Sequence, residues 1–111
     1  MTRKTSPQAD LILHIAKGED LPSEDGAFYR SASLTSEGFI HCSTMDQVLG
    51  PANQLFHGQA DLVLLCIDPK LVPHPIVYED CYKRGEAYPH IYGPLPWTAV
   101  REVIPFSPNP D

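Results

Sequence analysis

The chain has 111 residues, 42% of them hydrophobic and 20% charged, and a formal net charge of −6, which fits one globular domain with an ordinary core. Its eight Lys and Arg residues are scattered along the sequence, which disfavours duplex nucleic acid as a partner. The first ten residues are polar, and the apolar runs are too short to cross a bilayer. We therefore expect a soluble, cytoplasmic protein without a membrane partner, either a monomer or a weak dimer.

The cysteine pattern supports the same compartment. Cys42, Cys66 and Cys81 are an odd number without CxxC spacing, which argues against a disulfide framework and favours a reducing environment. Cys42 and Cys66 lie in apolar runs, where a thiol usually serves as a small core residue.

The apolar pattern predicts a set of short strands between two loose tails, residues 1–10 and 107–111. The folded domain then spans residues 11–106. Apolar runs typical of strands occur, in chain order, at 11–16, 39–42, 61–68, 75–80, 90–93 and 99–106. The run at 61–68 (DLVLLCID) is apolar on both faces, which predicts a strand buried in the middle of a sheet.

One segment changes to a helical period. Apolar residues from Met45 onward recur at a spacing close to i, i+3, i+4 and i+7, which predicts a helix over 44–57. Thr44 and Gln47 have the spacing of a capping box, and Pro51 predicts a bend. Together these elements predict an α+β fold, a single compact domain of mostly antiparallel strands with one main helix.

Three histidines interrupt the predicted strands. His14 lies in LILHIA, His41 in GFIHCST and His90 in YPHIYG. Because strand side chains alternate between faces, three such histidines from distant segments could meet in one cleft and form a ligand site. The structural alternative is that each imidazole simply satisfies a neighbouring carbonyl.

Carboxylates near these strands could assist such a site. Glu37 lies just before the strand of His41, whereas Glu79 and Asp80 end the run at 75–80. Acids at a strand end can act as general bases or bind ribose hydroxyls, and the alternative is a solvated strand terminus. Cys42 follows His41 directly, so the two side chains point to opposite faces and do not form a nucleophile–base pair. The chain has no nucleotide-binding glycine pattern, no HExxH and no GxSxG.

The motifs LHIA, SLTSEGFIHCST, DLVLLCID and YPHIYGPL, taken together, closely resemble the bacterial family called domain of unknown function 952. The resemblance covers Leu11 to about Phe106. It implies a small bacterial cytosolic protein without an established activity.

A more distant resemblance is to the ADP-ribosyltransferase superfamily, which implies a split sheet. In that likeness His14 corresponds to a histidine that holds the ribose of NAD, and His41 stands near an aromatic that stacks on nicotinamide. His90 occupies the place where many members carry a catalytic glutamate, which puts ordinary protein ADP-ribosylation in doubt. The likeness also implies that Arg30 could meet a phosphate.

Three functions therefore remain open. The first is an ADP-ribosyltransferase-like enzyme or binder of NAD, ADP-ribose or a nucleotide phosphate, with His14, His41 and His90 as catalytic residues and no metal. Its ligand-binding residues would be Arg30, Ser33, Ser43, Glu79 and Tyr92. The second is a metal-dependent enzyme in which the three histidines, with Glu79, hold zinc or iron. The third is a non-catalytic interaction module whose histidines belong to the core.

Overall fold

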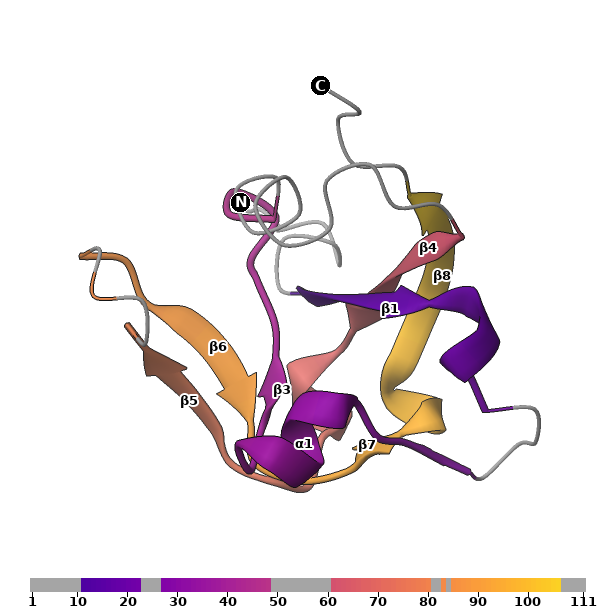
Figure 1. The fold of residues 1–111 in the computed structure, drawn as a ribbon, viewed down its shortest axis with the longest axis horizontal. Helices are drawn as coiled ribbons and strands as arrows, with labels where there is room; N and C mark the ends of the chain where they lie inside the picture. Colours follow the sequence, from indigo (N-terminus) through magenta and orange to yellow (C-terminus); the bar gives the residue numbers. More distant parts are fainter. Residues whose placement is uncertain (1–10, 23–26, 49–60, 81–82, 84, 107–111) are drawn as a thin grey trace, which may run out of the picture.

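Two three-stranded antiparallel sheets organise the chain, and they diverge from one another in Figure 1. The computed structural model describes residues 11–22, 27–48, 61–80, 83 and 85–106. The first sheet has the strand order β1-β4-β8 and consists of β1 (Ile12–Lys17), β4 (Leu62–Ile67) and β8 (Val100–Phe106). The second has the order β3-β6-β5 and consists of β3 (Ile40–His41), β6 (Tyr88–Ile91) and β5 (Ile76–Glu79).

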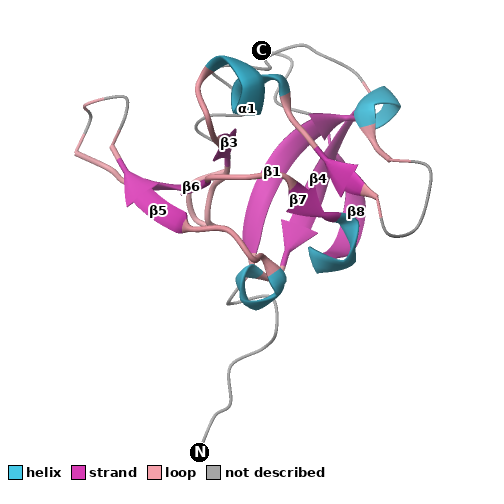
Figure 2. Cartoon of the chain, turned by 90° about the horizontal axis from the view of Figure 1, so that it is seen from below, coloured by secondary structure: helices cyan, strands magenta, loops and turns pink. Residues whose placement is uncertain are grey.

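Short elements connect the two sheets. A two-stranded antiparallel pair consists of β2 (Phe28–Tyr29) and β7 (Leu95–Pro96). The described helices are α1 (Ala32–Ser36) and the 3-10 turns η2 (Gly18–Asp20), η3 (Pro69–Leu71) and η4 (Trp97–Ala99). Figure 2 shows the β5–β6 hairpin projecting from the rest of the domain. No described helix is long and apolar enough to cross a membrane.

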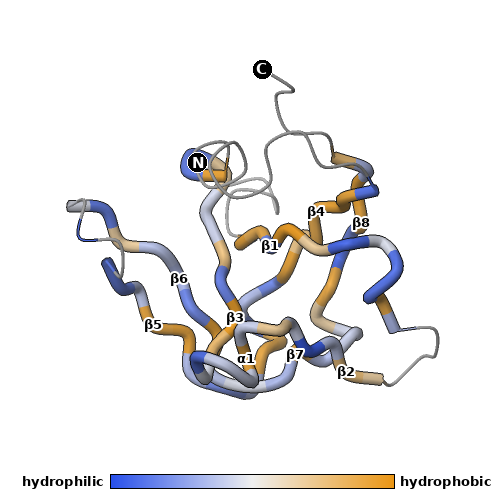
Figure 3. The backbone as a smooth tube through the Cα atoms, in the orientation of Figure 1, coloured by the Kyte–Doolittle hydropathy of each residue, from blue (hydrophilic) through white to orange (hydrophobic). Residues whose placement is uncertain are grey.

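The central position of β4 confirms the prediction from its two apolar faces. β4 pairs with β1 on one side and with β8 on the other. Leu65 and Ile67 on one face belong to the core cluster between the sheets, whereas Leu62 and Cys66 on the other face pack with Val48. β1 and β4 are correspondingly apolar over most of their lengths in Figure 3. Each fully buried aliphatic side chain stabilises the fold by roughly 1.5–3 kcal/mol.

The second sheet turns only one face toward this core. Ile40, Ile91 and Ile76 occupy paired positions on β3, β6 and β5 and pack with the core cluster between the sheets. The next residue pair along, His41 with His90, therefore lies on the opposite face, because strand side chains alternate. The alternation that produces a buried isoleucine row thus produces an outer row of histidines.

Several predicted boundaries need correction. The strand expected at 90–93 is β6, which begins two residues earlier, at Tyr88, because Tyr88 pairs with Glu79 of β5. The α-helix that the structure describes is α1, in a mixed polar segment for which no helix was predicted. A single turn of helix has too few apolar positions to show a period.

The predicted helix over 44–57 is only partly within the described residues. Residues 45–48 form a turn, and the Thr44 backbone N–H donates to Gln47 Oε1 at 3.1 Å, which is one of the two bonds of a capping box. Residues 49–57, with the bend expected at Pro51, lie outside the described residues, as do Cys81 and the expected tails.

Candidate functional site

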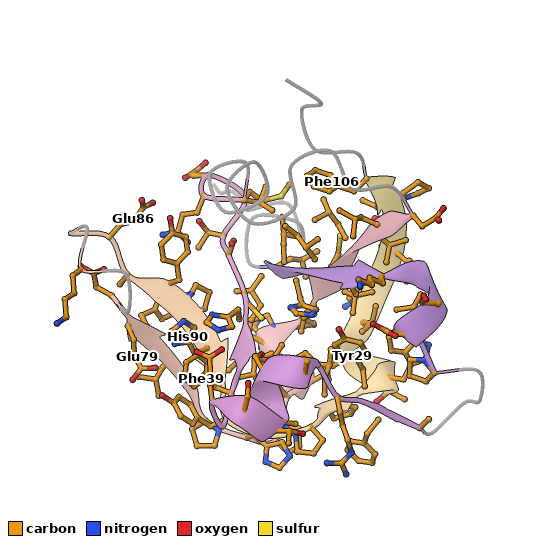
Figure 4. The ribbon with its side chains drawn as sticks, viewed as in Figure 1. Tyr29, Phe39, Glu79, Glu86, His90 and Phe106 are labelled. Atoms are coloured by element: carbon orange, nitrogen blue, oxygen red, sulfur yellow. The ribbon has the colours of Figure 1, made fainter. Side chains whose placement is uncertain are left out.

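The outer side of the β3-β6-β5 sheet gathers imidazole, aromatic and carboxylate side chains into one cluster. We call this cluster the histidine face, and its members are Glu37, Phe39, His41, Glu79, His90 and Tyr92. The ring centroids of His41 and His90 are 5.1 Å apart, in an edge-on arrangement. Figure 4 shows Phe39, Glu79 and His90 together beside β5 and β6, whereas Tyr29 lies apart from them.

His90 is the buried centre of the histidine face. Its side chain is 0% exposed, and the Phe39 ring stacks on it at 4.2 Å between centroids. The His90 Nδ1–H donates to Glu79 Oε1 at 2.8 Å, and the Tyr92 hydroxyl donates to the same oxygen at 2.6 Å. These bonds, with that from Tyr92 the stronger, lower the pKa of the Glu79 carboxyl. The Glu79 carboxylate is therefore held against the fixed imidazole of His90.

His41 is the histidine of this face that reaches solvent. Its side chain is 29% exposed, and its Nε2 lies 3.0 Å from Glu37 Oε2. Among the described residues, none forms a hydrogen bond with its Nδ1. His41 therefore offers one ring nitrogen to a ligand while a carboxylate orients the other.

A glycine brings Glu37 over His41. The backbone N–H of Gly38 bonds to the carbonyls of Ser33 and Leu34 at the end of α1, and its φ of +93° lies in the left-handed region. Glycine adopts this conformation without the penalty of a Cβ, so it commonly ends a helix. The chain then reverses into β3, which places Glu37 beside the residue four positions later.

His14 does not join the histidine face. It points to the core side of β1, where its Nδ1–H donates to the His41 carbonyl oxygen at 2.6 Å and its Nε2 accepts from the Tyr29 hydroxyl at 2.9 Å. Burial lowers its pKa to about 4, and burial together with the charge of Asp20 raises the pKa of Tyr29 to about 12. Both ring nitrogens of His14 have partners within the protein, so the structure does not bring His14 together with His41 and His90 in the histidine face.

The two predicted serines make contacts within the protein at either end of β3. Ser33 Oγ donates to the Phe39 carbonyl at 2.7 Å. Ser43 is buried, and its backbone forms a bridge with Leu13, with both N···O distances 2.7 Å. Arg30 is exposed and has no hydrogen bond or ion pair with a described residue. Of the five predicted ligand-binding residues, Glu79 and Tyr92 lie in the histidine face.

One member of the face, Phe39, was not predicted as a site residue, and another, Glu37, was predicted only as a carboxylate that could assist the site. Phe39 contacts three other members, His41, His90 and Tyr92, and Glu37 pairs with His41. The signal for Phe39 was its position two residues before His41, which gives it the same strand face. The signal for Glu37 was weaker, because its reach depends on the turn at Gly38.

Two other features of the surface bear on function. Among the residues that the structure describes, no group of three His, Cys, Asp or Glu side chains is arranged to hold a metal ion. A hollow of about 780 Å³ lies at the end of β1 and the start of β4, where it is lined by Lys17, Gly18, Glu19, Asp61, Leu62, Val63 and Pro105. None of the predicted site residues lines it.

The chain belongs to the family described as "Protein of unknown function (DUF952)", which it matches over residues 15–103. This confirms the family resemblance in the sequence motifs. The crystal structure of the protein CC0527 from Caulobacter crescentus is similar, with a TM-score of 0.74 and 31% identity over 86% of this chain and 84% of that chain. Its solution NMR structure gives a TM-score of 0.70 and 33% identity over 88% and 85% of the two chains. No curated protein matches the chain significantly.

Proposed function

We propose that the histidine face binds a nucleotide-type ligand, namely NAD, ADP-ribose or a nucleotide phosphate, and that the protein is an ADP-ribosyltransferase-like enzyme or binder in the bacterial cytosol. The observation that carries the proposal is the arrangement around His41. A partly exposed imidazole has one nitrogen held by Glu37, 3.0 Å away, and its ring lies against the buried ring of His90. Oriented imidazoles of this kind bind ligands and transfer protons.

The remaining members of the face have distinct roles in this proposal. His41 meets the ligand and exchanges a proton with it, and Glu37 orients the imidazole. His90 is fixed from behind by Glu79, and Phe39 and Tyr92 supply ring surface on which a base or sugar packs. The proposal thus needs one exposed acid–base group, His41, beside the aromatic rings of Phe39 and Tyr92.

The arrangement of the sheets supports the transferase-like interpretation. β3 is the edge strand of its sheet that lies nearest to the other sheet in Figure 1, and the backbone around it connects to both sheets. Ser43, just beyond β3, bridges to β1, and β3 itself pairs with β6. A split sheet of this kind is what the distant resemblance to ADP-ribosyltransferases implies.

His14 has a different role in the proposal from the one that the resemblance implies. It contacts the backbone carbonyl of His41 rather than solvent. We therefore assign it to positioning β3, so that a change at His14 acts on the ligand site through His41.

Calorimetric titration with NAD, ADP-ribose and AMP tests the proposal. Wild-type protein should bind at least one of them, and His41→Ala should weaken that binding by about tenfold or more, because it removes a charge-assisted hydrogen bond. Glu102→Gln is the matched control, since Glu102 is an exposed acid on β8 in the other sheet. Absence of binding to the wild type, or equal binding by wild type and His41→Ala, would contradict the proposal.

A non-catalytic interaction module is the second candidate. It is favoured by the internal bonds of both His14 nitrogens and by the position of the hollow, which lies away from the histidines. The same titration separates the two functions, because an interaction module gives no response to any of these ligands. A histidine-ligated metal enzyme finds less support, because His14 already uses both ring nitrogens and does not reach the other two imidazoles.

A further inference from the structure

We infer that the histidine face recognises an uncharged ring with neighbouring hydroxyl groups, such as the ribose of a nucleoside, and not a phosphate. The inference rests on the proposed function and specifies which part of the ligand docks there. It comes from the charges, free acceptors and aromatic surfaces of the face.

The charge of the face opposes an anion. Its formal charges are the carboxylates of Glu37 and Glu79, and each is paired with an imidazole. Among the described residues, no Lys or Arg contacts either carboxylate. A phosphate held here would lie near two like charges without a guanidinium or ammonium partner, which is the reverse of the usual phosphate site.

The acceptors on the face suit hydroxyl groups. Glu79 uses one oxygen, Oε1, for both His90 and Tyr92, and Glu37 uses only Oε2, for His41. In the part of the chain that the structure describes, Oε2 of Glu79 and Oε1 of Glu37 accept no hydrogen bond. The two side chains are 38% and 50% exposed, respectively, so each can accept a bond from a ligand hydroxyl.

The aromatic rings of the histidine face offer a surface on which a sugar ring can pack. Phe39 contacts His41, His90 and Tyr92 at centroid distances of 4.8, 4.2 and 5.2 Å. His90 is fully buried, so the partly exposed rings of Phe39, His41 and Tyr92 form the surface that a ligand can reach. Sugar rings pack their C–H edges on such surfaces while carboxylates bind their hydroxyls, just as an acidic residue binds ribose in dinucleotide sites. The phosphates of a nucleotide would then point away from the face.

Titrations with adenosine, AMP and 2′-deoxyadenosine test this inference. We expect adenosine to bind within about threefold of AMP, because the phosphate adds no contact, and 2′-deoxyadenosine to bind at least about tenfold more weakly. Glu37→Gln should weaken adenosine binding by about tenfold, since it replaces a charged acceptor by a neutral one. Glu79→Gln is the second variant, because Glu37 also orients His41, and Glu102→Gln is again the control.

Whether the two Glu→Gln variants strengthen AMP binding or weaken adenosine binding distinguishes a phosphate site from a ribose site. If AMP binds but adenosine does not, or if Glu37→Gln and Glu79→Gln both strengthen AMP binding, the face recognises phosphate; the inference is then overturned and the proposed function stands. If the wild type binds neither adenosine nor any nucleotide, the proposed function fails and the inference with it. Weaker adenosine binding in both variants, with the deoxy analogue discriminated, supports the inference.

Discussion

Two histidine environments lie on either side of β3, and they differ in almost every property that matters for function. On the core side, His14 is buried, and its nitrogens bond to a carbonyl and to the Tyr29 hydroxyl. On the outer side, His41 is 29% exposed and shares a cluster of rings and carboxylates with His90. The contrast shows that the environment of a histidine in an apolar strand depends on which residues pack against its face of the strand.

The two environments are joined through the backbone of His41, because its carbonyl accepts from His14 while its side chain joins the outer face. The core pair is therefore predicted to govern stability, and the outer face is predicted to govern ligand binding. The following predictions test this division in order of expected size.

The largest effect is expected from His14→Ala. The substitution leaves a cavity and removes the partners of the His41 carbonyl and the Tyr29 hydroxyl, so the free energy of unfolding should fall by about 3 kcal/mol. Urea denaturation measures the change. Tyr29→Phe, which removes only the hydroxyl, should cost less; an equal or smaller loss for His14→Ala would contradict the assigned role of the pair.

The buried pair should also make stability depend on pH. The pKa of His14 is lowered from 6.5 to about 4 in the folded protein. Between pH 6.5 and 4 the unfolded chain therefore binds a proton at His14 that the folded protein does not. Stability is then full above pH 6.5 and falls by roughly 3 kcal/mol from this group as the pH drops toward 4.

Unfolding curves at several pH values in a His14→Gln variant check this prediction. Its profile between pH 6.5 and 4 should be flatter than that of the wild type, whereas Tyr29→Phe should keep the slope because His14 still titrates. A slope unchanged by His14→Gln would assign the pH dependence to other groups.

A smaller effect is expected from Phe39→Leu on the outer face. The change removes the stack on His90 and should lower stability by about 1 kcal/mol beyond the loss of buried area. It should also weaken ligand binding, because the ligand loses the Phe39 ring on which it packs. Phe28→Leu is the matched control, since Phe28 is 50% exposed; equal losses for the two variants would show that the stack contributes nothing.

The smallest stability effect is expected from His41→Ala. A partly exposed side-chain pair contributes less than about 1 kcal/mol, so the unfolding midpoint should stay near that of the wild type while ligand binding weakens by about tenfold or more. A loss as large as that of His14→Ala would mean that the outer histidine is also a structural residue, and the two environments would no longer differ in role.

The candidate site could be predicted in part from the sequence. Strand alternation identified His41 and His90 and, on the same face as His90, Tyr92. Alternation along β1 also puts His14 on the core face that Ile12 and Ala16 share, but it carries no information about Tyr29. Tyr29 comes from a two-residue strand that has no period of its own.

The sequence alone determined the family, through the resemblance of its motifs. It also determined the strands and the central place of β4, because apolar periodicity reports which faces of a strand are buried. Only the tertiary structure decided which histidines meet. That outcome depends on the pairing of β3 with β6, on the turn at Gly38 that brings Glu37 to His41, and on the closeness of Tyr29 to His14. Most of these contacts join distant segments. A local sequence pattern specifies which face of its strand a residue occupies, but not which segment packs against that face.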